Sequence, residues 1–349
     1  MPNTVRVRML NVGQGDAIVG LLPDGDRAFV VDVYDADKVL DFLDEVGISE
    51  VVLFLSHSDR DHTEGASDFI AEFPLTGRIL GIFYNQDRLN ARRESDYVKL
   101  TRLIGQFSRL EERRNPDYLY ANFNTNLNLI PRFAAVFSDS CHVAVVHPAY
   151  ADQSSLVGQD INETAGVLMV EATVGSGERR RMLLAAEVQL TGISLILDRE
   201  SEGSIRADVL KFPHHGAWPE DWPGISSVNV EKRTLEDFLQ AVQPSRVIVS
   251  AGFKNSYGHV RQEVFELLEQ YYRDTGSLEA LKCTQFTPTC LARVALPNDG
   301  AFREPHCAGD IEVRLGAAVE ILTFPAPHLD RVAKLHRVGS AGCAFLLQD

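Results

Sequence analysis

The chain has 349 residues, of which 45% are hydrophobic, and its formal net charge is -15. Phosphate contacts dominate the affinity of proteins for long nucleic acids, so this acidic balance counts against a freestanding, nonspecific binder of duplex DNA. A small substrate, a partner that supplies positive charge or a localised basic patch fits the charge better. No apolar run approaches the ~20 residues that a membrane helix needs, and the first residues lack a signal-peptide core. We therefore expect a soluble, cytoplasmic protein that does not bind membranes.

The chain begins with strand patterns and then alternates strands with helices. Residues 5–9 alternate apolar and charged side chains, as a half-buried strand does. Residues 16–22 and 27–33 flank the turn-forming Pro23-Asp24-Gly25-Asp26, which predicts a hairpin. Helical patterns follow at residues 37–46, 64–73, 235–242 and 262–272. Further strands are predicted at residues 51–55, 78–84, 142–147, 166–173, 181–187, 208–212 and 246–250. Periodicity alone supports only a mixed α and β fold.

Two segments stand apart from this alternation. Residues 85–137 are predicted to form a mostly helical insertion, and residues 281–349 a β-rich C-terminal appendage. Between residues 88 and 114 the insertion mixes arginines and lysines with acidic residues. A solvated helix face with ion pairs is the usual form of such a charge run. A substrate-facing basic strip, with Tyr97, Phe107, Tyr118 and Tyr120 available for stacking, is the alternative.

The most informative segment is His57-Ser58-Asp59-Arg60-Asp61-His62, which follows the predicted strand at 51–55. Four of its side chains are potential metal ligands. A strand end fixes the backbone, so side chains two and four residues apart can converge on one point. Metal sites need that convergence, because ligand distances tolerate deviations of only about 0.2 Å. The segment therefore predicts a metal site in preference to a polar loop with a fortuitous pattern.

Three further segments complete a pattern that resembles a known family. They are Leu10-Asn11-Val12-Gly13-Gln14-Gly15-Asp16-Ala17, Leu210-Lys211-Phe212-Pro213-His214-His215-Gly216 and Asn255-Ser256-Tyr257-Gly258-His259. With the His57–His62 segment, and in this order, they resemble the metallo-β-lactamase superfamily. The branch most similar is the ComEC-like one, which comprises the hydrolase domain of the competence protein ComEC and its soluble relatives. The resemblance implies an α+β fold, the αββα sandwich, with a hydrolase domain over residues 1–280.

In this family two divalent metal ions lie a few ångströms apart, linked by one carboxylate and a water. The resemblance implies that Glu187 bridges the ions. The other ligands would form two sets: His57, Asp59 and the His214-His215 pair in one, and Asp61, His62 and His259 in the other. Asp61 is also a candidate catalytic residue. Asp59 stands where many members have histidine, and a carboxylate shifts the preference of the site from zinc towards manganese.

One member of the His214-His215 pair is expected only to support the site. His214 leaves its strand first and is the expected ligand, so His215 would hydrogen-bond the substrate or donate a proton to it. Asp16, in the turn that matches the family pattern, is expected to orient a ligating histidine from behind, and Asp32, at the end of the next strand, is expected to act similarly. Two residues are candidates for substrate binding: Asn162 and Tyr257.

Glu187 departs from the family pattern, in which Leu-Leu-Thr-Gly-Asp ends this strand. The present chain has Leu183-Leu184-Ala185-Ala186-Glu187. A glutamate can bridge two ions, but a backbone shift of about 1 Å must absorb its extra methylene, and catalytic geometry is sensitive to such shifts. A degraded or single-metal site is the alternative. Val260 also replaces a proline that usually follows the last histidine, which loosens that turn without removing the ligand.

Five cysteines in a chain of this length do not indicate a secreted disulfide framework. A candidate structural zinc site comprises Cys283, Cys290 and Cys307, with a fourth ligand from His306, His328 or His336. Its spacing fits no standard zinc finger, because close Cys-x2-Cys pairs are absent. Buried apolar cysteines are the alternative.

Three functions remain open. The first is a metal-dependent hydrolase, in particular a phosphodiesterase or nuclease in which a water held by two zinc or manganese ions attacks nucleic acid or a nucleotide. The second is a hydrolase of small phosphoesters, such as nucleotides or phosphocholine-type esters, which the net charge favours. The third is a non-catalytic, metal-bound component of a multi-protein assembly whose partners share its operon. The oligomeric state is open as well.

Overall fold

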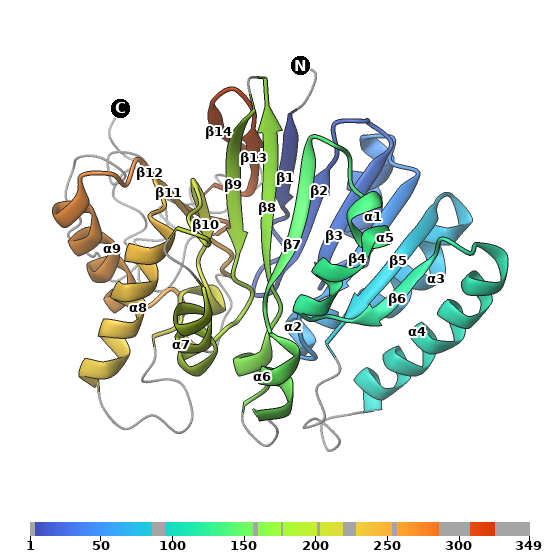
Figure 1. Ribbon diagram of the computed structural model, residues 1–349, viewed down its shortest axis with the longest axis horizontal. Coiled ribbons are helices and arrows are strands. Elements are labelled where there is room, and N and C mark those ends of the chain that lie inside the picture. Colours follow the sequence, from blue (N-terminus) through green and yellow to red (C-terminus); the bar gives the residue numbers. More distant parts are fainter. Residues whose placement is uncertain are drawn as a thin grey trace, which may run out of the picture.

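The computed structural model describes residues 4–85, 95–155, 160–175, 177–200, 203–218, 228–252, 257–285 and 308–324. Within them, two β-sheets pack face to face, and helices cover the outer face of each sheet (Figure 1). The αββα sandwich predicted from the family resemblance is therefore confirmed. The bounds of the elements differ from the predicted ones by a few residues in most cases.

The first sheet has the strand order β14-β13-β1-β2-β3-β4-β5-β6. Its neighbours β1, β2 and β3 run antiparallel, as the hairpin pattern around Gly25 predicted, whereas β3 to β6 run parallel. Val5, Val7 and Met9 are buried at alternate positions of β1, so its period-two pattern turns one face to the core. The strands are β1 (Val5–Met9), β2 (Ala17–Leu21), β3 (Arg27–Val33), β4 (Glu50–Leu55), β5 (Arg78–Tyr84), β6 (Leu119–Asn122), β13 (Asp310–Leu315) and β14 (Val319–Phe324).

The second sheet has the strand order β12-β11-β10-β9-β8-β7. Strands β9 to β12 run parallel, so the carboxyl ends of β9, β10 and β11 lie at the same edge of the sheet. The loops that leave this edge carry several candidate ligands. The strands are β7 (Cys141–His147), β8 (Val167–Val174), β9 (Glu178–Leu184), β10 (Val209–Lys211), β11 (Arg246–Val249) and β12 (Ala280–Cys283).

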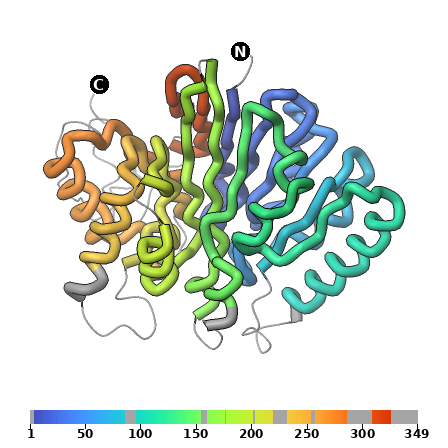
Figure 2. The backbone as a smooth tube through the Cα atoms, viewed as in Figure 1, coloured from blue at the N-terminus to red at the C-terminus, as the bar shows by residue number. Residues whose placement is uncertain are grey.

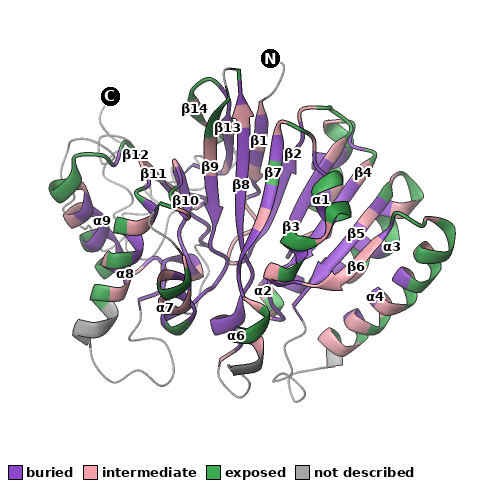
Figure 3. Ribbon diagram, in the orientation of Figure 1, coloured by how far each residue is buried: buried purple, intermediate pink, exposed green. Residues whose placement is uncertain are grey.

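The helices bury one side against a sheet and expose the other. Helices α1 (Ala36–Glu45), α3 (Ala66–Glu72) and α4 (Ser95–Arg114) share an apolar cluster with the outer face of β2 to β5. Helices α7 (Leu190–Arg199), α8 (Val228–Val242) and α9 (Gln262–Thr275) do the same for the second sheet. Figure 3 shows mostly buried strands and exposed residues gathered on the outward sides of the helices. The shorter elements are α2 (Arg60–Thr63), η1 (Phe73–Leu75), η3 (Thr125–Leu129), α5 (Pro131–Ala135), α6 (Tyr150–Ser155), η4 (Ile161–Thr164) and η5 (His214–Gly216).

Phe54 of β4 lies within the core that the two sheets enclose, and it is fully buried. Its ring centroid lies 5.2 Å from that of Phe83, 5.5 Å from Phe123, 6.1 Å from Phe133 and 6.5 Å from Phe137. Three of these partners belong to the segment predicted as an insertion. That segment therefore contributes to the central core of the sandwich.

The predicted insertion is helical over most of its described length but also adds β6 to the first sheet, next to β5. On α4, Lys99 pairs with Asp96, as expected for a solvated helix face. Tyr118 is buried, hydrogen-bonds to Ser108 and packs edge to face with Phe107. These rings pack within the protein, which argues against the stacking strip considered above.

Two predicted helices have different bounds. The helix predicted at 64–73 is divided, because α2 begins within the ligand segment at Arg60 and α3 begins after Gly65. Helix α8 begins at Val228 instead of residue 235. The exposed Lys232 and Arg233 interrupt the apolar period in its first turns, so the sequence pattern showed only the second half.

The described residues after 280 are hydrogen-bonded into both sheets. Strand β12 pairs with β11, and β13 pairs with β1 from Val5↔Leu315 to Met9↔Ile311. Figure 2 shows the red hairpin of β13 and β14 beside the blue N-terminal strand. The domain division at residue 280 stays a prediction, but part of the segment after it belongs to the two sheets. None of the described helices is long and apolar enough to cross a membrane.

Replacing Phe54 with alanine is expected to destabilise the fold by about 3–5 kcal/mol, because it removes a large side chain from a packed interior. The free energy of unfolding in urea measures the effect. Leu75→Ala is the control, since Leu75 is 82% exposed and its truncation is expected to change stability by less than about 0.5 kcal/mol. Equal losses for the two variants would contradict the assignment of Phe54 to the shared core.

Candidate metal centre

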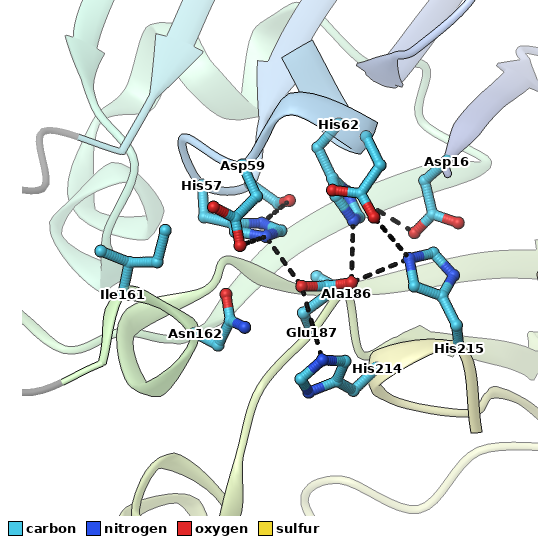
Figure 4. A network of polar contacts seen from close by, with 12 residues as sticks. Asp16, His57, Asp59, His62, Ile161, Asn162, Ala186, Glu187, His214 and His215 are labelled. Carbon is cyan, nitrogen blue, oxygen red and sulfur yellow. Dashed lines mark hydrogen bonds and ion pairs between the residues drawn. The ribbon is translucent and has the colours of Figure 1, made fainter. Parts of the chain in front are cut away.

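The candidate ligands lie in loops at the carboxyl ends of strands (Figure 4). His57 and His62 follow β4 of the first sheet, Glu187 follows β9 of the second, and His214 and His215 follow β10. Residues far apart in the chain therefore meet: His57 and Glu187 are 130 positions apart and their side chains are in contact. The convergence at strand ends that the sequence predicted is present.

The His57–His62 segment forms a compact turn. The backbone N–H of His62 and the hydroxyl of Thr63 both donate to the Asp59 carbonyl, at 3.1 and 3.0 Å. Gly15 lies against this turn with φ at 144°, and a Cβ there would lie 2.5 Å from the Asp61 carbonyl oxygen. Only glycine allows this close approach, which places the loop before β2 at the edge of the site.

The carboxylate of Glu187 lies at the centre of the site. Its Oε2 is 3.1 Å from His57 Nε2 and 3.9 Å from His214 Nε2. Its Oε1 is 2.8 Å from His215 Nε2 and 3.4 Å from His62 Nε2. Each oxygen faces its own pair of imidazoles, which is the arrangement that a carboxylate bridging two cations requires.

Two aspartates complete the surroundings of this carboxylate. Asp59 Oδ2 lies 3.8 Å from His57 Nε2, and Asp61 Oδ2 lies 3.7 Å from His215 Nε2. The potential ligand atoms form two groups, each within 4.8 Å: His57, Asp59 and Glu187 in one, and Asp61, His62, Glu187 and His215 in the other. Both groups contain imidazole and carboxylate ligands and share the same bridging residue.

The two adjacent histidines point to different sides of the bridging carboxylate. His214 faces the oxygen next to His57, as expected of a ligand. His215 lies beside Asp61 and His62, in a ligand position, whereas the sequence suggested a proton donor. His259 is buried, and its ring centroid is 5.7 Å from that of His214. The group of potential ligands around Asp61 and His62 therefore contains His215 and not His259, and the ligand role predicted for His259 stays a prediction.

His57 and His62 are held from behind by one carboxylate. His62 Nδ1 donates to Asp32 Oδ2 at 2.6 Å. His57 Nδ1 donates to the hydroxyl of Ser56 at 2.9 Å, and that hydroxyl donates to Asp32 Oδ2 at 2.7 Å. Asp32 therefore orients both rings, one directly and one through Ser56. The orienting role predicted for Asp32 agrees with these contacts.

The third anchored histidine is His215, whose Nδ1 donates to the carbonyl of Ser250 at 2.9 Å. A carbonyl or carboxylate oxygen can only accept, so Nδ1 carries the proton in His62 and His215, and the neutral ring has its lone pair on Nε2. Both Nε2 atoms are buried and make no hydrogen bond of good geometry, although they face Glu187.

A lone pair that faces a carboxylate oxygen is repelled by it unless a proton or a cation lies between them. Imidazole nitrogens and carboxylate oxygens are the ligands that zinc and manganese accept in proteins. The donor set and the orientation of the rings therefore fit divalent metal ions, which the two groups that contain Glu187 would hold. Without metal ions, the buried Nε2 atoms that face Glu187 avoid this repulsion only if they carry protons.

Backbone strain is concentrated at this centre. Of the five described non-glycine residues with positive φ, four lie here: Asp32, Ala186, His214 and His215, with φ between 42° and 59°. The left-handed conformation costs an L-residue about 1–2 kcal/mol. Such strain persists only where the surrounding structure over-determines the backbone, and it is common at functional sites. These residues are therefore held in place against their local preference.

The charges of the centre are coupled through Glu187. Burial raises the pKa of Glu187, but attraction to the four surrounding histidines outweighs it and holds the pKa well below its ordinary value. Burial lowers the pKa of His62, but Asp32 and Glu187 outweigh it and raise that pKa well above the ordinary value. The pKa of His57 is also raised, since Glu187 outweighs burial and the repulsion of His62. The raised pKa values favour protons on these two rings when no metal ion is bound.

Two predicted substrate-binding residues lie near the ligands. Asn162, in η4, is beside His57 and Asp59 (Figure 4), and its Oδ1 is buried without a hydrogen-bond partner. Tyr257 is 67% exposed, and its ring stacks on that of His259 with centroids 5.7 Å apart. Contact of either residue with a substrate stays a prediction.

The candidate structural zinc site is described only in part. Cys283 is buried at the end of β12, whereas Cys290, Cys307 and the three histidines considered with them lie outside the described residues. The zinc site stays a prediction.

Cys141 lies in the core between the sheets, and burial raises the pKa of its thiol to about 12, so it is unreactive at neutral pH.

Three buried residues that hold the centre together were not predicted: Ser56, Ser250 and Lys211. The two serines carry no sequence signal beyond their place beside a ligand or a strand end. Lys211 does carry one, because it lies in the apolar stretch Val209-Leu210-Lys211-Phe212. A lysine in a buried strand is rare and requires a partner.

The sequence is similar to proteins of two kinds, and no family model matches it. A segment of 91 residues is 37% identical to ComE operon protein 3 of Bacillus subtilis (strain 168), covering 23% of this chain and 10% of that protein. The matched part thus spans about a tenth of this relative. Over 244 residues the chain is 24% identical to a hydroxyacylglutathione hydrolase of Glaesserella parasuis serovar 5 (strain SH0165), covering 69% of this chain and 95% of the relative.

Solved structures similar to this chain include three at low identity. The metallo-β-lactamase fold protein YhfI from Bacillus subtilis has 11% identity and a TM-score of 0.41, covering 75% of this chain and 93% of its own. Unliganded yeast PDE1 has 11% identity and a TM-score of 0.42, and the match covers 78% of this chain and 95% of that one. A long form RNase Z from yeast has 10% identity and a TM-score of 0.42, and the match covers 72% of this chain and 37% of that one. Likeness at this level concerns the fold alone and bears on no residue of the site.

We expect pH to act in opposite directions on the metal-free and the metal-bound protein. Because the pKa values of His57 and His62 are raised in the folded state, their contribution to metal-free stability is complete below about pH 6.5 and is lost as the pH rises through the raised values. Metal ions need the same nitrogens deprotonated, so stabilisation by metal grows over that range. Melting temperatures from about pH 6 to pH 9, with a chelator and with manganese or zinc, measure both. Melting temperatures that change with pH in the same way with the chelator and with metal would contradict this expectation.

Ser56→Ala is expected to weaken metal binding about tenfold, because His57 loses the contact that fixes its tautomer and ring orientation. Competition with a fluorescent chelator measures the dissociation constant. The matched control is Ser108→Ala, which removes another buried hydroxyl, one that contacts Tyr118 on the outer side of the first sheet. The control should keep its metal affinity, and the same loss in both variants would exclude a specific role of Ser56.

Proposed function

We propose that this protein is a metal-dependent hydrolase whose centre holds two divalent ions bridged by Glu187. One observation carries the proposal: Oε1 of this carboxylate faces His62 and His215, and Oε2 faces His57 and His214. Two ions in such a centre supply a water of lowered pKa and positive charge for a developing oxyanion. The similarity to a hydroxyacylglutathione hydrolase over 95% of that relative supports hydrolysis as the reaction.

A phosphodiester is the substrate that we infer for this centre. Asp59 and Asp61 add carboxylate oxygens to the ligand groups, and such ligands suit manganese as well as zinc. The local identity of 37% with ComE operon protein 3 supports the ComEC-like relationship. The net charge of -15 favours a nucleotide or a short single strand over a long duplex.

The residues of the chain have distinct parts in this proposal. Asp61 belongs to a ligand group, and its side chain is 29% exposed, so a proton that it accepts can pass to solvent. His215 would hold a metal ion, because its Nδ1 contacts the Ser250 carbonyl and its Nε2 faces Glu187. The acid role that the sequence suggested stays a prediction. Asn162 offers a buried, unpaired Oδ1 to a donor group of the substrate. Tyr257 offers an exposed ring for stacking beside the centre.

A second candidate substrate is hydroxyacylglutathione, because the relative that bears its name matches 69% of this chain. The two candidates differ in the group that is cleaved, so a substrate panel separates them. Incubation of the metal-free protein with a dinucleotide, long single- and double-stranded DNA, and hydroxyacylglutathione, each with manganese or zinc, forms that panel. Cleavage of the dinucleotide or the single strand supports the phosphodiesterase. Turnover of hydroxyacylglutathione alone supports the second candidate, and metal binding without any turnover supports a non-catalytic component.

Glu187→Asp is expected to lower kcat/KM about a hundredfold, although it restores the family residue, because it withdraws the carboxylate by roughly 1 Å from a backbone fixed for glutamate. Steady-state kinetics on the cleaved substrate measures the loss. Glu171→Gln is the matched control: Glu171 is buried on β8 and pairs with Arg181, away from the ligand groups. Full activity of Glu187→Asp would show that the bridge tolerates the change, and equal activity of Glu187→Gln would refute the bridge itself.

A further inference from the structure

Lys211 is fully buried at the carboxyl end of β10, three residues before His214. Val209, two residues earlier, belongs to the core between the sheets, so Lys211 points to the same face, towards the first sheet. An ammonium group in such a place loses its hydration, and its burial is unfavourable unless it is paired and hydrogen-bonded. Its partners therefore indicate why the chain carries it.

The ammonium group contacts both halves of the site. Its Nζ lies 2.5 Å from Asp16 Oδ2, on the loop before β2 of the first sheet. It also donates a hydrogen bond of 3.0 Å to the carbonyl of Ala186, which immediately precedes Glu187. Lys211 is thus the direct link from Asp16 to the backbone that carries the bridging carboxylate.

Asp16, Asp32 and His62 form a third group of potential ligands within 4.8 Å of one another. Burial raises the pKa of Asp16, but the attraction of Lys211, His215 and His62 outweighs it and the pKa is lowered. The ammonium of Lys211, 2.5 Å from Oδ2, is the counter-ion of the Asp16 carboxylate. The positive charge that a metal ion would bring to this third group is therefore supplied by the side chain of Lys211.

Ala186 needs external support for its conformation. Its φ is 42°, a value that glycine adopts freely and alanine rarely, and the family pattern has glycine at this position. Two donors hold its carbonyl: the backbone N–H of His214 at 2.9 Å and Lys211 Nζ at 3.0 Å. Without the second donor, Ala186 is free to relax towards negative φ, which would turn the Glu187 side chain away from the histidines.

We propose that Lys211 is a positioning residue: its ammonium is the built-in cation of the Asp16–Asp32–His62 group, and through the Ala186 carbonyl it holds Glu187 in the bridging position. The proposal rests on the dinuclear centre proposed above. It implies that the centre around Glu187 and Asp16 binds two metal ions and not three. It also implies that Lys211 acts on metal affinity through the backbone of Ala186.

The test is a double-mutant cycle on the full chain, with the affinity for manganese and for zinc measured by chelator competition. Lys211→Met keeps the length of the side chain and removes its charge. Each variant with Lys211→Met also carries Asp16→Asn, so that neither a buried carboxylate nor a buried ammonium is left without its counter-ion, and the cycle cancels the effect of Asp16→Asn that both backgrounds share. Lys211→Met is expected to weaken metal binding at least about tenfold when Ala186 is present. In the background with Ala186→Gly the loss is expected to shrink to about threefold or less, because glycine keeps the positive φ without support.

Each outcome decides the proposal. Equal losses with alanine and with glycine at position 186, or no loss in either, would overturn the action through Ala186. Three manganese ions per unsubstituted chain, measured by elemental analysis after metal removal and reloading with manganese alone, would overturn the built-in cation, because the candidate cysteine site favours zinc. Melting temperatures of the metal-free variants identify a lysine that only stabilises the fold, since that role lowers them without changing metal affinity. An unsubstituted chain that binds no metal would instead refute the dinuclear centre, so the two failures are distinguishable.

Discussion

One buried carboxylate, that of Glu187, connects the two halves of this sandwich. It stands at the end of β9 in the second sheet, and its oxygens face His57 and His62 from the first sheet as well as His214 and His215 from its own. A carboxylate in such a place is strongly unfavourable without positive charge around it. The raised pKa values of His57 and His62 favour protons on these two rings when no metal is bound, and the proposed divalent ions would supply the positive charge instead. The geometry of the site follows from this single requirement for charge balance.

The fold meets the requirement by overriding local backbone preference. Asp32, Ala186, His214 and His215 all have positive φ, and each is held by contacts that come from other elements. Ser250 holds His215 from β11, Ser56 and Asp32 hold the rings that follow β4, and the His214 N–H and Lys211 hold Ala186. The residues that make these contacts follow strands of the two sheets, and the packed aromatic core holds those strands in place. The stability of the core and the precision of the site are therefore linked through the strand ends.

Sequence patterns predicted the parts of this arrangement that depend on neighbouring residues. The alternation of β1, the turn at Gly25 and the ligand-rich segment after β4 are local, and each appears where it was expected. The pairing of β13 with β1 joins opposite ends of the described chain, and no local pattern specifies it. The different sides taken by His214 and His215 also escaped prediction, because they depend on two consecutive positive φ values. Local preference opposes those values, so only the assembled fold can impose them.

Ala186 and Glu187 stand where the family pattern that the sequence resembles has Gly-Asp, and the two differences depend on each other. A glutamate alone would carry its carboxylate too far from a backbone built for aspartate, or would fold back in several rotamers. Alanine alone would strain a conformation that glycine accepts. Together, the longer side chain reaches both pairs of imidazoles, and the backbone before it is fixed by Lys211 and the His214 N–H. In the dinuclear centre proposed above, the buried lysine would let the longer acid keep the position of a bridge. The choice between a dinuclear and a degraded centre stays a prediction.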